Sequence, residues 1–135
     1  MKTISNSQLT IRVSPHGAEL CNIVCNGKEY LWQADPSFWK RHSPVLFPIV
    51  GSVWENEYRI DGATYNLTQH GFARDMNFEL IREQPDELRY RLADNEESRR
   101  RYPFPFRLEI GYRIQGKQIE VLWEVKNTGD KELHF

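Results

Sequence analysis

The stretch PVLFPIVGSVWENEYRIDGATYNLTQHGFARD, residues 44–75, contains the strongest sequence signals for both fold and function in this chain. It joins an apolar run that ends at Gly51, a strand pair, and the compact string QHGFARD of residues 69–75. In that string a titratable imidazole stands beside a glycine that permits a tight turn, an aromatic ring, and a guanidinium next to a carboxylate. These are the components of a small polar-ligand site, so the flanking residues are interpreted as its scaffold.

Within this stretch, Pro48 cannot donate a hydrogen bond to a sheet ladder, so residues 45–51 are predicted as a strand end or an edge crossing. Residues 58–60 and 63–67 flank the dipeptide Asp61-Gly62, which favours a tight β-hairpin. The central stretch is therefore expected to be made of strands and turns.

The rest of the chain repeats the same signals. Apolar and polar residues alternate with the period of a half-buried strand, or flank hairpin dipeptides, in the segments 9–13, 18–25, 28–33, 78–82, 88–92, 108–114 and 119–125. Residues 34–43 are predicted as a loop or a single helical turn, 94–101 as an exposed loop or short helix, and 133–135 as the start of another strand. With nine or ten strands, the predicted class is all-β, an antiparallel β-sandwich that is incomplete in this chain.

Length and charge limit the classes of function. A chain of 135 residues with 39% hydrophobic content is expected to form one domain. Its 18 basic and 19 acidic residues give a formal charge of −1, which argues against nucleic acid or an anionic membrane as a partner. The first residues lack the apolar core of a signal peptide, and no apolar segment reaches about 18 residues. A cytoplasmic protein is expected.

The cysteines and most histidines predict no metal centre. Cys21 and Cys25 lie in an apparent strand about 13 Å apart, too far for a disulfide, and two separated thiols without a second pair do not complete a zinc shell. They are interpreted as reduced core thiols. His16, His42 and His134 belong to no metal motif. The run Arg99–Arg101 is either a phosphate patch or a solvated face whose field the preceding acids cancel.

His70 is the sharpest candidate for chemistry, because an imidazole at a strand end can transfer a proton or bond a hydroxyl. The alternative is a surface histidine or one satisfied in the core. Arg74 can fork onto two vicinal hydroxyls, or it can simply pair with Asp75. A content of 13% aromatic residues suits sugar binding as well as core packing. Spacing does not distinguish among the nearby carboxylates, Glu55, Glu57, Asp61 and Asp75.

The central stretch resembles the aldose 1-epimerase (galactose mutarotase-like) family, in particular its LacX-like branch. The resemblance rests on FPIVGS, Tyr58, Tyr65 and above all QHGFARD, and it is supported by the strings GAEL, YLWQ, FWKRHSPVLFP, YPFPF and VKNTGD. It implies a large antiparallel β-sandwich that holds a sugar. It also implies a cofactor-free isomerase in which a carboxylate and a histidine interconvert the α and β anomers of a free aldose by ring opening.

Carried over to this sequence, the resemblance makes His70 a catalytic and substrate-binding residue and assigns Arg74 and Phe72 to the sugar. It places the second histidine and the catalytic glutamate beyond residue 135, so residues 1–135 are expected to be the N-terminal part of a single sandwich domain and to be inactive alone. The arginine that some members carry after the FPxxG glycine is replaced here by Ser52-Val53-Trp54. Two alternatives remain: a non-catalytic sugar-binding module, and a fragment that forms a homo-oligomer through exposed strand edges.

Overall fold

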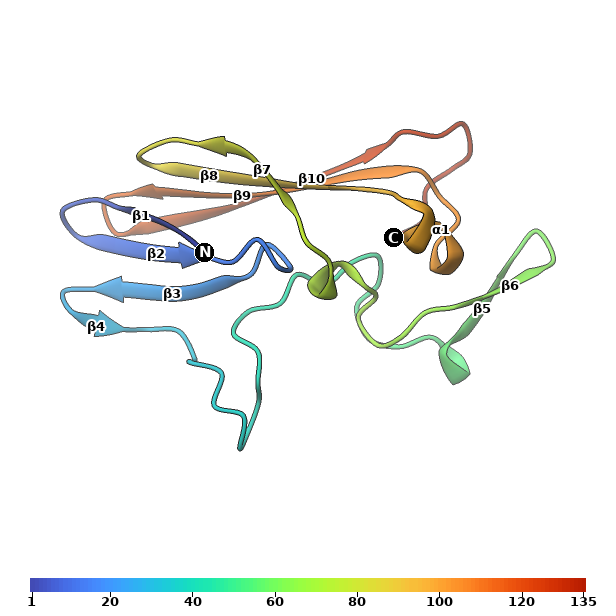
Figure 1. The fold of residues 1–135 in the computed structure, drawn as a ribbon, viewed down its shortest axis with the longest axis horizontal. Helices are drawn as coiled ribbons and strands as arrows, with labels where there is room; N and C mark the ends of the chain where they lie inside the picture. The colour runs from blue at the N-terminus through green and yellow to red at the C-terminus, as the bar shows by residue number, and fades with distance from the viewer.

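The computed structural model describes all 135 residues and contains two four-stranded antiparallel sheets and a separate hairpin. The first sheet has the order β1-β2-β3-β4, and the second has the order β10-β9-β8-β7 (Figure 1). The strands of the first sheet are β1 (Lys2–Ser5), β2 (Leu9–Val13), β3 (Leu20–Cys25) and β4 (Lys28–Glu29). Those of the second are β7 (Glu79–Glu83), β8 (Glu87–Ala93), β9 (Phe106–Gln115) and β10 (Gln118–Asn127).

The apolar core lies between the two sheets. Alternate residues of each strand point inward, so that Ile11 and Val13 of β2 and Leu88 and Ile110 of the opposite sheet are fully buried. Buried close-packed side chains of this kind are the main source of stability. A polar link crosses the core as well, because the Tyr112 hydroxyl donates a hydrogen bond of 2.7 Å to the Ala18 carbonyl.

The outer face of the second sheet carries a lattice of ion pairs. Buried Glu87 accepts bonds from Arg113 and lies 3.1 Å from Arg89, and buried Glu109 accepts one from Arg91. Burial raises the pKa of Glu87, but the hydrogen bond from Arg113 and the charges of the neighbouring arginines outweigh that effect. The pKa of Glu87 therefore lies below its ordinary value.

The remaining elements connect or flank the sheets. The hairpin of β5 (Glu57–Ile60) and β6 (Ala63–Asn66) extends away from both sheets in Figure 1. Short 3₁₀ turns, η1 (Trp54–Asn56) and η2 (Ala73–Asp75), precede and follow that hairpin. The α-helix α1 (Glu96–Arg101) is capped by Asn95, and no helix has the length and hydropathy to span a bilayer.

The sandwich is open along β10. Val121 and Trp123 of β10 face the core side, yet they are 48% and 50% exposed. Beside them lies an apolar hollow of about 450 Å³ lined by Leu46, Phe47, Pro48, Ile49, Val50, Trp123, Val125 and Phe135. A second hollow of about 310 Å³ lies between the β5–β6 hairpin and the last residues, His134 and Phe135.

The predicted all-β sandwich is confirmed, and the hairpins at residues 26–27, 61–62 and 116–117 form where the turn dipeptides predicted them. Residues 94–101 give the short helix, in which all three arginines pair with Asp94, Glu96 and Glu97. Three expectations differ, the first being that residues 28–33 give only the two-residue strand β4. Strand β1 was not expected, because its only buried residue is Ile4 and it shows no alternation. Residues 133–135 form no strand, because no neighbouring strand pairs with them.

Candidate functional site

The site is built by pairing two segments that flank the β5–β6 hairpin. The Phe47 carbonyl accepts bonds from the amides of Phe72 and Ala73, at 3.0 and 3.2 Å. The His70 amide donates to the Gly51 carbonyl at 2.7 Å. The apolar run and the QHGFARD string are therefore held side by side by their backbones, and the side chains between them take fixed directions.

Gly71 is required by this close approach. Its backbone has a φ of 70°, and a Cβ at this position would lie 2.2 Å from the Phe47 carbonyl oxygen. No side chain larger than hydrogen fits there without moving the backbone. His70 also has a positive φ, of 65°, which is rare for a residue with a side chain. The turn presents the imidazole at the rim of the paired segments.

The orientation of the His70 ring is set by Gly51, whose amide donates a 2.9 Å hydrogen bond to His70 Nδ1. Because Nδ1 accepts this bond, the neutral ring carries its proton on Nε2. The second ring nitrogen is then a hydrogen-bond donor, held in place by the backbone. Such a group can donate a hydrogen bond to an oxygen atom of a ligand.

Arg74 is anchored near the same turn. Its Nη2 donates a 2.7 Å hydrogen bond to the Gln69 carbonyl, while its Nε lies 3.7 Å from Asp75 Oδ2, beyond hydrogen-bonding distance. Asp75 instead accepts a 2.7 Å bond from Arg41. The guanidinium has five N–H donors, so Arg74 retains donors beyond this one anchoring bond.

His70 and Arg74 line one hollow of about 450 Å³. Its other lining residues are Trp39, Ser43, Pro44, Leu46 and Gln69. Trp39 is 49% exposed and supplies an aromatic side chain to a polar site, which is the combination that binds the apolar side of a pyranose. The lining includes no carboxylate, so the groups in this hollow can donate hydrogen bonds and pack on a ligand, but they offer no carboxylate base.

Phe72 does not share the exposure of its neighbours in the motif. Its ring is 1% exposed and packs against Phe47 and Phe106, with centroids 6.3 and 6.0 Å away. The turn at Gly71 directs this side chain inward, and a ring so buried has no face open to a sugar. In this structure Phe72 packs in the core and does not line the hollow at His70, so its predicted contact with the sugar has no support from this geometry.

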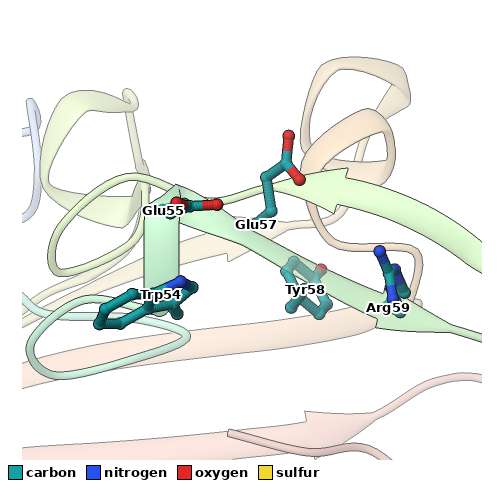
Figure 2. Close-up of a pocket in the computed structure, with 5 residues that line it drawn as sticks. All are labelled: Trp54, Glu55, Glu57, Tyr58 and Arg59. Carbon is teal, nitrogen blue, oxygen red and sulfur yellow. The ribbon is translucent and has the colours of Figure 1, made fainter.

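None of the four carboxylates that the sequence does not distinguish lines this hollow. Asp61 bonds Lys131 at 2.8 Å, and that hydrogen bond and charge hold the pKa of Asp61 below its ordinary value. Glu55 and Glu57 line a separate hollow of about 270 Å³ with Trp54, Tyr58 and Arg59, as Figure 2 shows. That hollow contains no histidine, and the Tyr58 hydroxyl is already bonded to the Arg101 carbonyl.

Two residues that line the hollow, Trp39 and Ser43, are not identified by the sequence motifs. They belong to the irregular segment between β4 and the central stretch, where neither strand periodicity nor a helical repeat is present. The string FWKRHSP, which supported the family resemblance, was the one signal that pointed to this segment. Only the folded backbone brings it beside residues 69–74.

The family model described as aldose 1-epimerase matches residues 1–135. The chain belongs to the aldose 1-epimerase family. The predicted resemblance to this family is confirmed over the whole sequence.

Individual relatives agree with this assignment. The plasmid-encoded protein LacX of Lactococcus lactis subsp. lactis is 33% identical, in a match that covers 92% of this chain and 44% of LacX. A structure from Lactobacillus acidophilus, described as a galactose mutarotase related enzyme, is 40% identical with a TM-score of 0.94 and matches 96% of this chain and 44% of its own. A galactose mutarotase-like protein from Lactobacillus casei is 34% identical with a TM-score of 0.93, over 97% and 45% of the two chains. The aldose 1-epimerase fold is thus shared closely, while this chain spans less than half the length of these relatives.

Proposed function

We propose that residues 1–135 form the N-terminal part of a single aldose 1-epimerase sandwich and supply the hydrogen-bonding side of its sugar site. The observation that carries the proposal is the Gly51 amide bond to His70 Nδ1, which leaves Nε2–H as the free donor of a residue that lines the same hollow as Arg74. In this proposal His70 bonds the sugar near the reacting centre. Arg74 forks onto neighbouring hydroxyls, and Trp39 covers an apolar ring face.

The reaction proposed for the complete domain is the interconversion of the α and β anomers of a free aldose. A carboxylate removes the anomeric hydroxyl proton while a histidine protonates the ring oxygen, and the ring opens and closes on the other face. By family resemblance, the carboxylate and the second histidine belong to sequence beyond residue 135. No cofactor is required, because both steps are proton transfers.

This proposal predicts sugar binding without turnover by the 135-residue chain. Polarimetry of freshly dissolved α-D-glucose and α-D-galactose measures anomer exchange directly, and we expect the rate in the presence of the chain to equal that in buffer. Catalysis close to that of a full-length relative, abolished in His70→Ala, would contradict the proposal. His16→Ala is the matched control, since His16 is bonded to Asn77 and is absent from the hollow.

Binding is measured separately by saturation-transfer NMR with the same sugars and by the fluorescence of tryptophan. We expect His70→Ala and Arg74→Ala each to weaken binding about 10-fold, which corresponds to the loss of a charge-assisted or well-oriented hydrogen bond. His16→Ala should leave binding unchanged. Equal affinity in all four proteins would exclude the hollow as the sugar site.

A second candidate is a sugar-binding module that performs no chemistry in its complete form. The hollow offers hydrogen-bond donors and an aromatic side chain, which are the groups that binding alone requires. The same polarimetry, repeated on the longest reading frame that contains this chain, decides between the two candidates. Acceleration that depends on His70 supports the enzyme, whereas binding with no acceleration supports the module.

We further propose that the protein is cytoplasmic. We also propose that the isolated chain associates with a second copy through β10. The half-exposed Val121 and Trp123 favour this, as does the adjoining apolar hollow, because contiguous apolar surface of this kind promotes association. Size-exclusion chromatography with light scattering should give a dimer that Trp123→Ser converts to monomer. A monomeric wild-type chain would contradict the association.

A further inference from the structure

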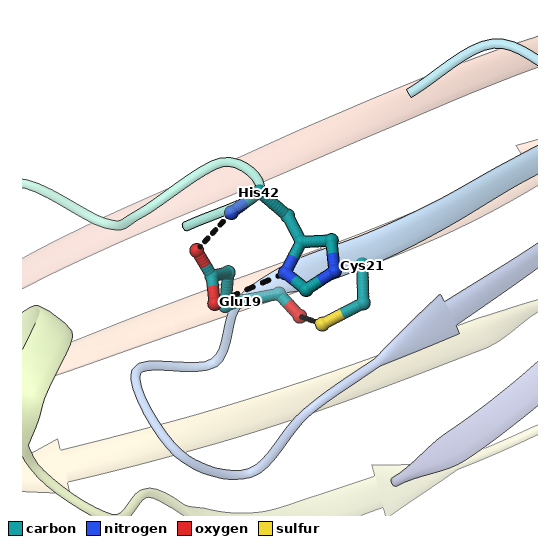
Figure 3. Close-up of side chains that lie close together, drawn as sticks. All are labelled: Glu19, Cys21 and His42. Carbon is teal, nitrogen blue, oxygen red and sulfur yellow. Dashed lines mark hydrogen bonds and ion pairs between the residues drawn. The ribbon is translucent and has the colours of Figure 1, made fainter. Parts of the chain in front are cut away.

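Three side chains of the types that bind zinc meet at the start of β3. Glu19 immediately precedes that strand, Cys21 lies within it, and His42 comes from the irregular segment that follows β4. One ligand atom from each lies within 4.8 Å of the other two. Figure 3 shows the imidazole beside the carboxylate, and the thiol nearby, where it donates a 3.3 Å hydrogen bond to the Glu19 carbonyl. None of the three lines the hollow at His70.

The two oxygens of Glu19 have different surroundings. Oε1 accepts hydrogen bonds from the amides of His42 and Ser43, at 3.0 and 3.2 Å. Oε2 accepts no hydrogen bond, and it lies 3.7 Å from His42 Nδ1. One oxygen therefore fixes the carboxylate in place while the other remains available.

The separation of Glu19 Oε2 and His42 Nδ1 suits two ligands of one ion better than a hydrogen bond, and the Cys21 thiol lies within 4.8 Å of the other two ligand groups. Bonds of about 2.0–2.1 Å from zinc to nitrogen and oxygen place two ligands about 3.3 Å apart at the tetrahedral angle, and a thiolate at about 2.3 Å lies slightly further from each. The distance of 3.7 Å between Oε2 and Nδ1 is too long for a hydrogen bond and within a few tenths of an ångström of that edge.

Burial and charge fit the same ion. Cys21 is 3% exposed, whereas the side chains of His42 and Glu19 are 24% and 16% exposed, so a bound ion would have sulfur on its inner side and access to water on its outer side. A thiolate and a carboxylate together balance a charge of +2. Sulfur and imidazole ligands select zinc-like ions over Mg²⁺ and Ca²⁺, which prefer oxygen.

We propose that Glu19, Cys21 and His42 form a three-ligand site for a divalent thiophilic cation of the Zn²⁺ class, with water in the fourth position. Sequence spacing does not predict this site, because Glu19, Cys21 and His42 come together only in the folded chain and Cys25 takes no part. The ion would fasten the segment that carries Trp39 and Ser43 to strand β3. The site thereby stabilises one wall of the neighbouring hollow without entering it.

The test is a titration of the metal-free 135-residue chain with Zn²⁺ by calorimetry and with Co²⁺ by absorption. We expect one ion per chain and a thiolate-to-cobalt charge-transfer band. Cys21→Ser and His42→Gln should each weaken Zn²⁺ binding at least about 10-fold, because even changes outside the coordination sphere cost about 10–100-fold. Glu19→Gln should weaken it as well, while its amide oxygen preserves the bonds to the His42 and Ser43 amides.

The matched controls are Cys25→Ser and His16→Gln, which remove the same side-chain types outside the cluster and should leave affinity unchanged. Circular dichroism checks that each variant is folded, and if Cys21→Ser does not fold, the His42 and Glu19 variants decide. Absence of the cobalt–thiolate band, or equal losses in the controls and the cluster variants, would overturn the proposal. No sugar is present, so the result is independent of the proposed function.

Discussion

Ile110 and Trp123 lie opposite each other on β9 and β10, yet Ile110 is fully buried and Trp123 is 50% exposed. Ile110 belongs to the closed end of the sandwich, where the two sheets face each other. Trp123 belongs to the open end, which comprises the core-side face of β10, the apolar hollow beside it, and the second hollow between the β5–β6 hairpin and the last residues. Both strands alternate apolar and polar residues in the same way. The alternation therefore determines which face of a strand is apolar but not what covers that face.

The largest contrast between the two ends is expected from truncating one side chain at each. Ile110→Ala should lower the free energy of unfolding by about 4 kcal/mol, because it removes buried surface and leaves a cavity. Val121→Ala, on the open face, should cost less than about 1 kcal/mol in the Trp123→Ser monomer, where no second copy covers that face. Urea denaturation followed by circular dichroism measures both. Similar losses would mean that the open face is covered in solution.

The pairing of residues 47–51 with 70–73 connects the two ends, and Gly71→Ala tests that connection. A Cβ would meet the Phe47 carbonyl at 2.2 Å, and the positive φ adds strain, so we expect a loss of about 3 kcal/mol. Gly27→Ala is the matched control, since Gly27 also has a positive φ but nothing lies within 4 Å of its added Cβ. It should cost about 1 kcal/mol by thermal denaturation. If the two losses are equal, the close approach contributes nothing.

The outer face of the closed end responds to acid through Glu87. Its pKa is lowered in the folded state, so its contribution is present above the unfolded value of about 4.3 and is lost as pH falls through the folded value. Glu87→Gln should therefore cost about 2 kcal/mol at pH 7, and the difference from wild type should shrink towards pH 3. Urea titrations across this pH range give the comparison.

The control for that experiment is Glu120→Gln on β10, which shares Arg113 as its partner but has a half-exposed side chain. It should cost less than about 0.5 kcal/mol. A difference from wild type that stays constant between pH 7 and pH 3 in Glu87→Gln would contradict the role assigned to the Glu87 charge.

The smallest effect is expected from the hydrogen bond that joins the sheets at the closed end. Tyr112→Phe removes the donor to the Ala18 carbonyl and should cost about 1 kcal/mol. Tyr30→Phe should have no measurable effect, because Tyr30 is 62% exposed and its hydroxyl makes no such bond. Chemical denaturation distinguishes the pair. An equal response would show that the buried hydroxyl exchanges its partner for water.

Sequence predicted the parts of the fold that local patterns encode. The long strands β9 and β10 alternate clearly, and the turn dipeptides at residues 26–27 and 61–62 require positive φ values that these residues adopt readily. Strand β1 escaped prediction because its pairing with β2, rather than its own pattern, stabilises it. The short strand β4 ended earlier than expected, since the Glu29 side chain bonds the amides of Tyr30 and Leu31.

The candidate site was predictable to the same extent. The string QHGFARD located His70 and Arg74, because the motif and its turn are contiguous in sequence. The inward direction of Phe72 depends on the Phe47 carbonyl, and the presence of Trp39 in the hollow depends on a segment some distance away along the chain. The cluster of Glu19, Cys21 and His42 likewise exists only after folding. Contacts of this kind leave no periodic trace in a sequence.

The pairing of Gly51 with His70 also makes the chain between them a loop that is closed at its base. Two hydrogen bonds hold its ends together, from the His70 amide to the Gly51 carbonyl and from the Gly51 amide to His70 Nδ1. The β5–β6 hairpin lies within this closed loop and ends in an exposed tip at Asp61-Gly62. Exposed tips of this kind tolerate inserted sequence. The tip is thus a suitable point for inserting a peptide or an affinity tag. The hydrogen bonds between Gly51 and His70 at the base of the loop should keep the geometry of His70 unchanged.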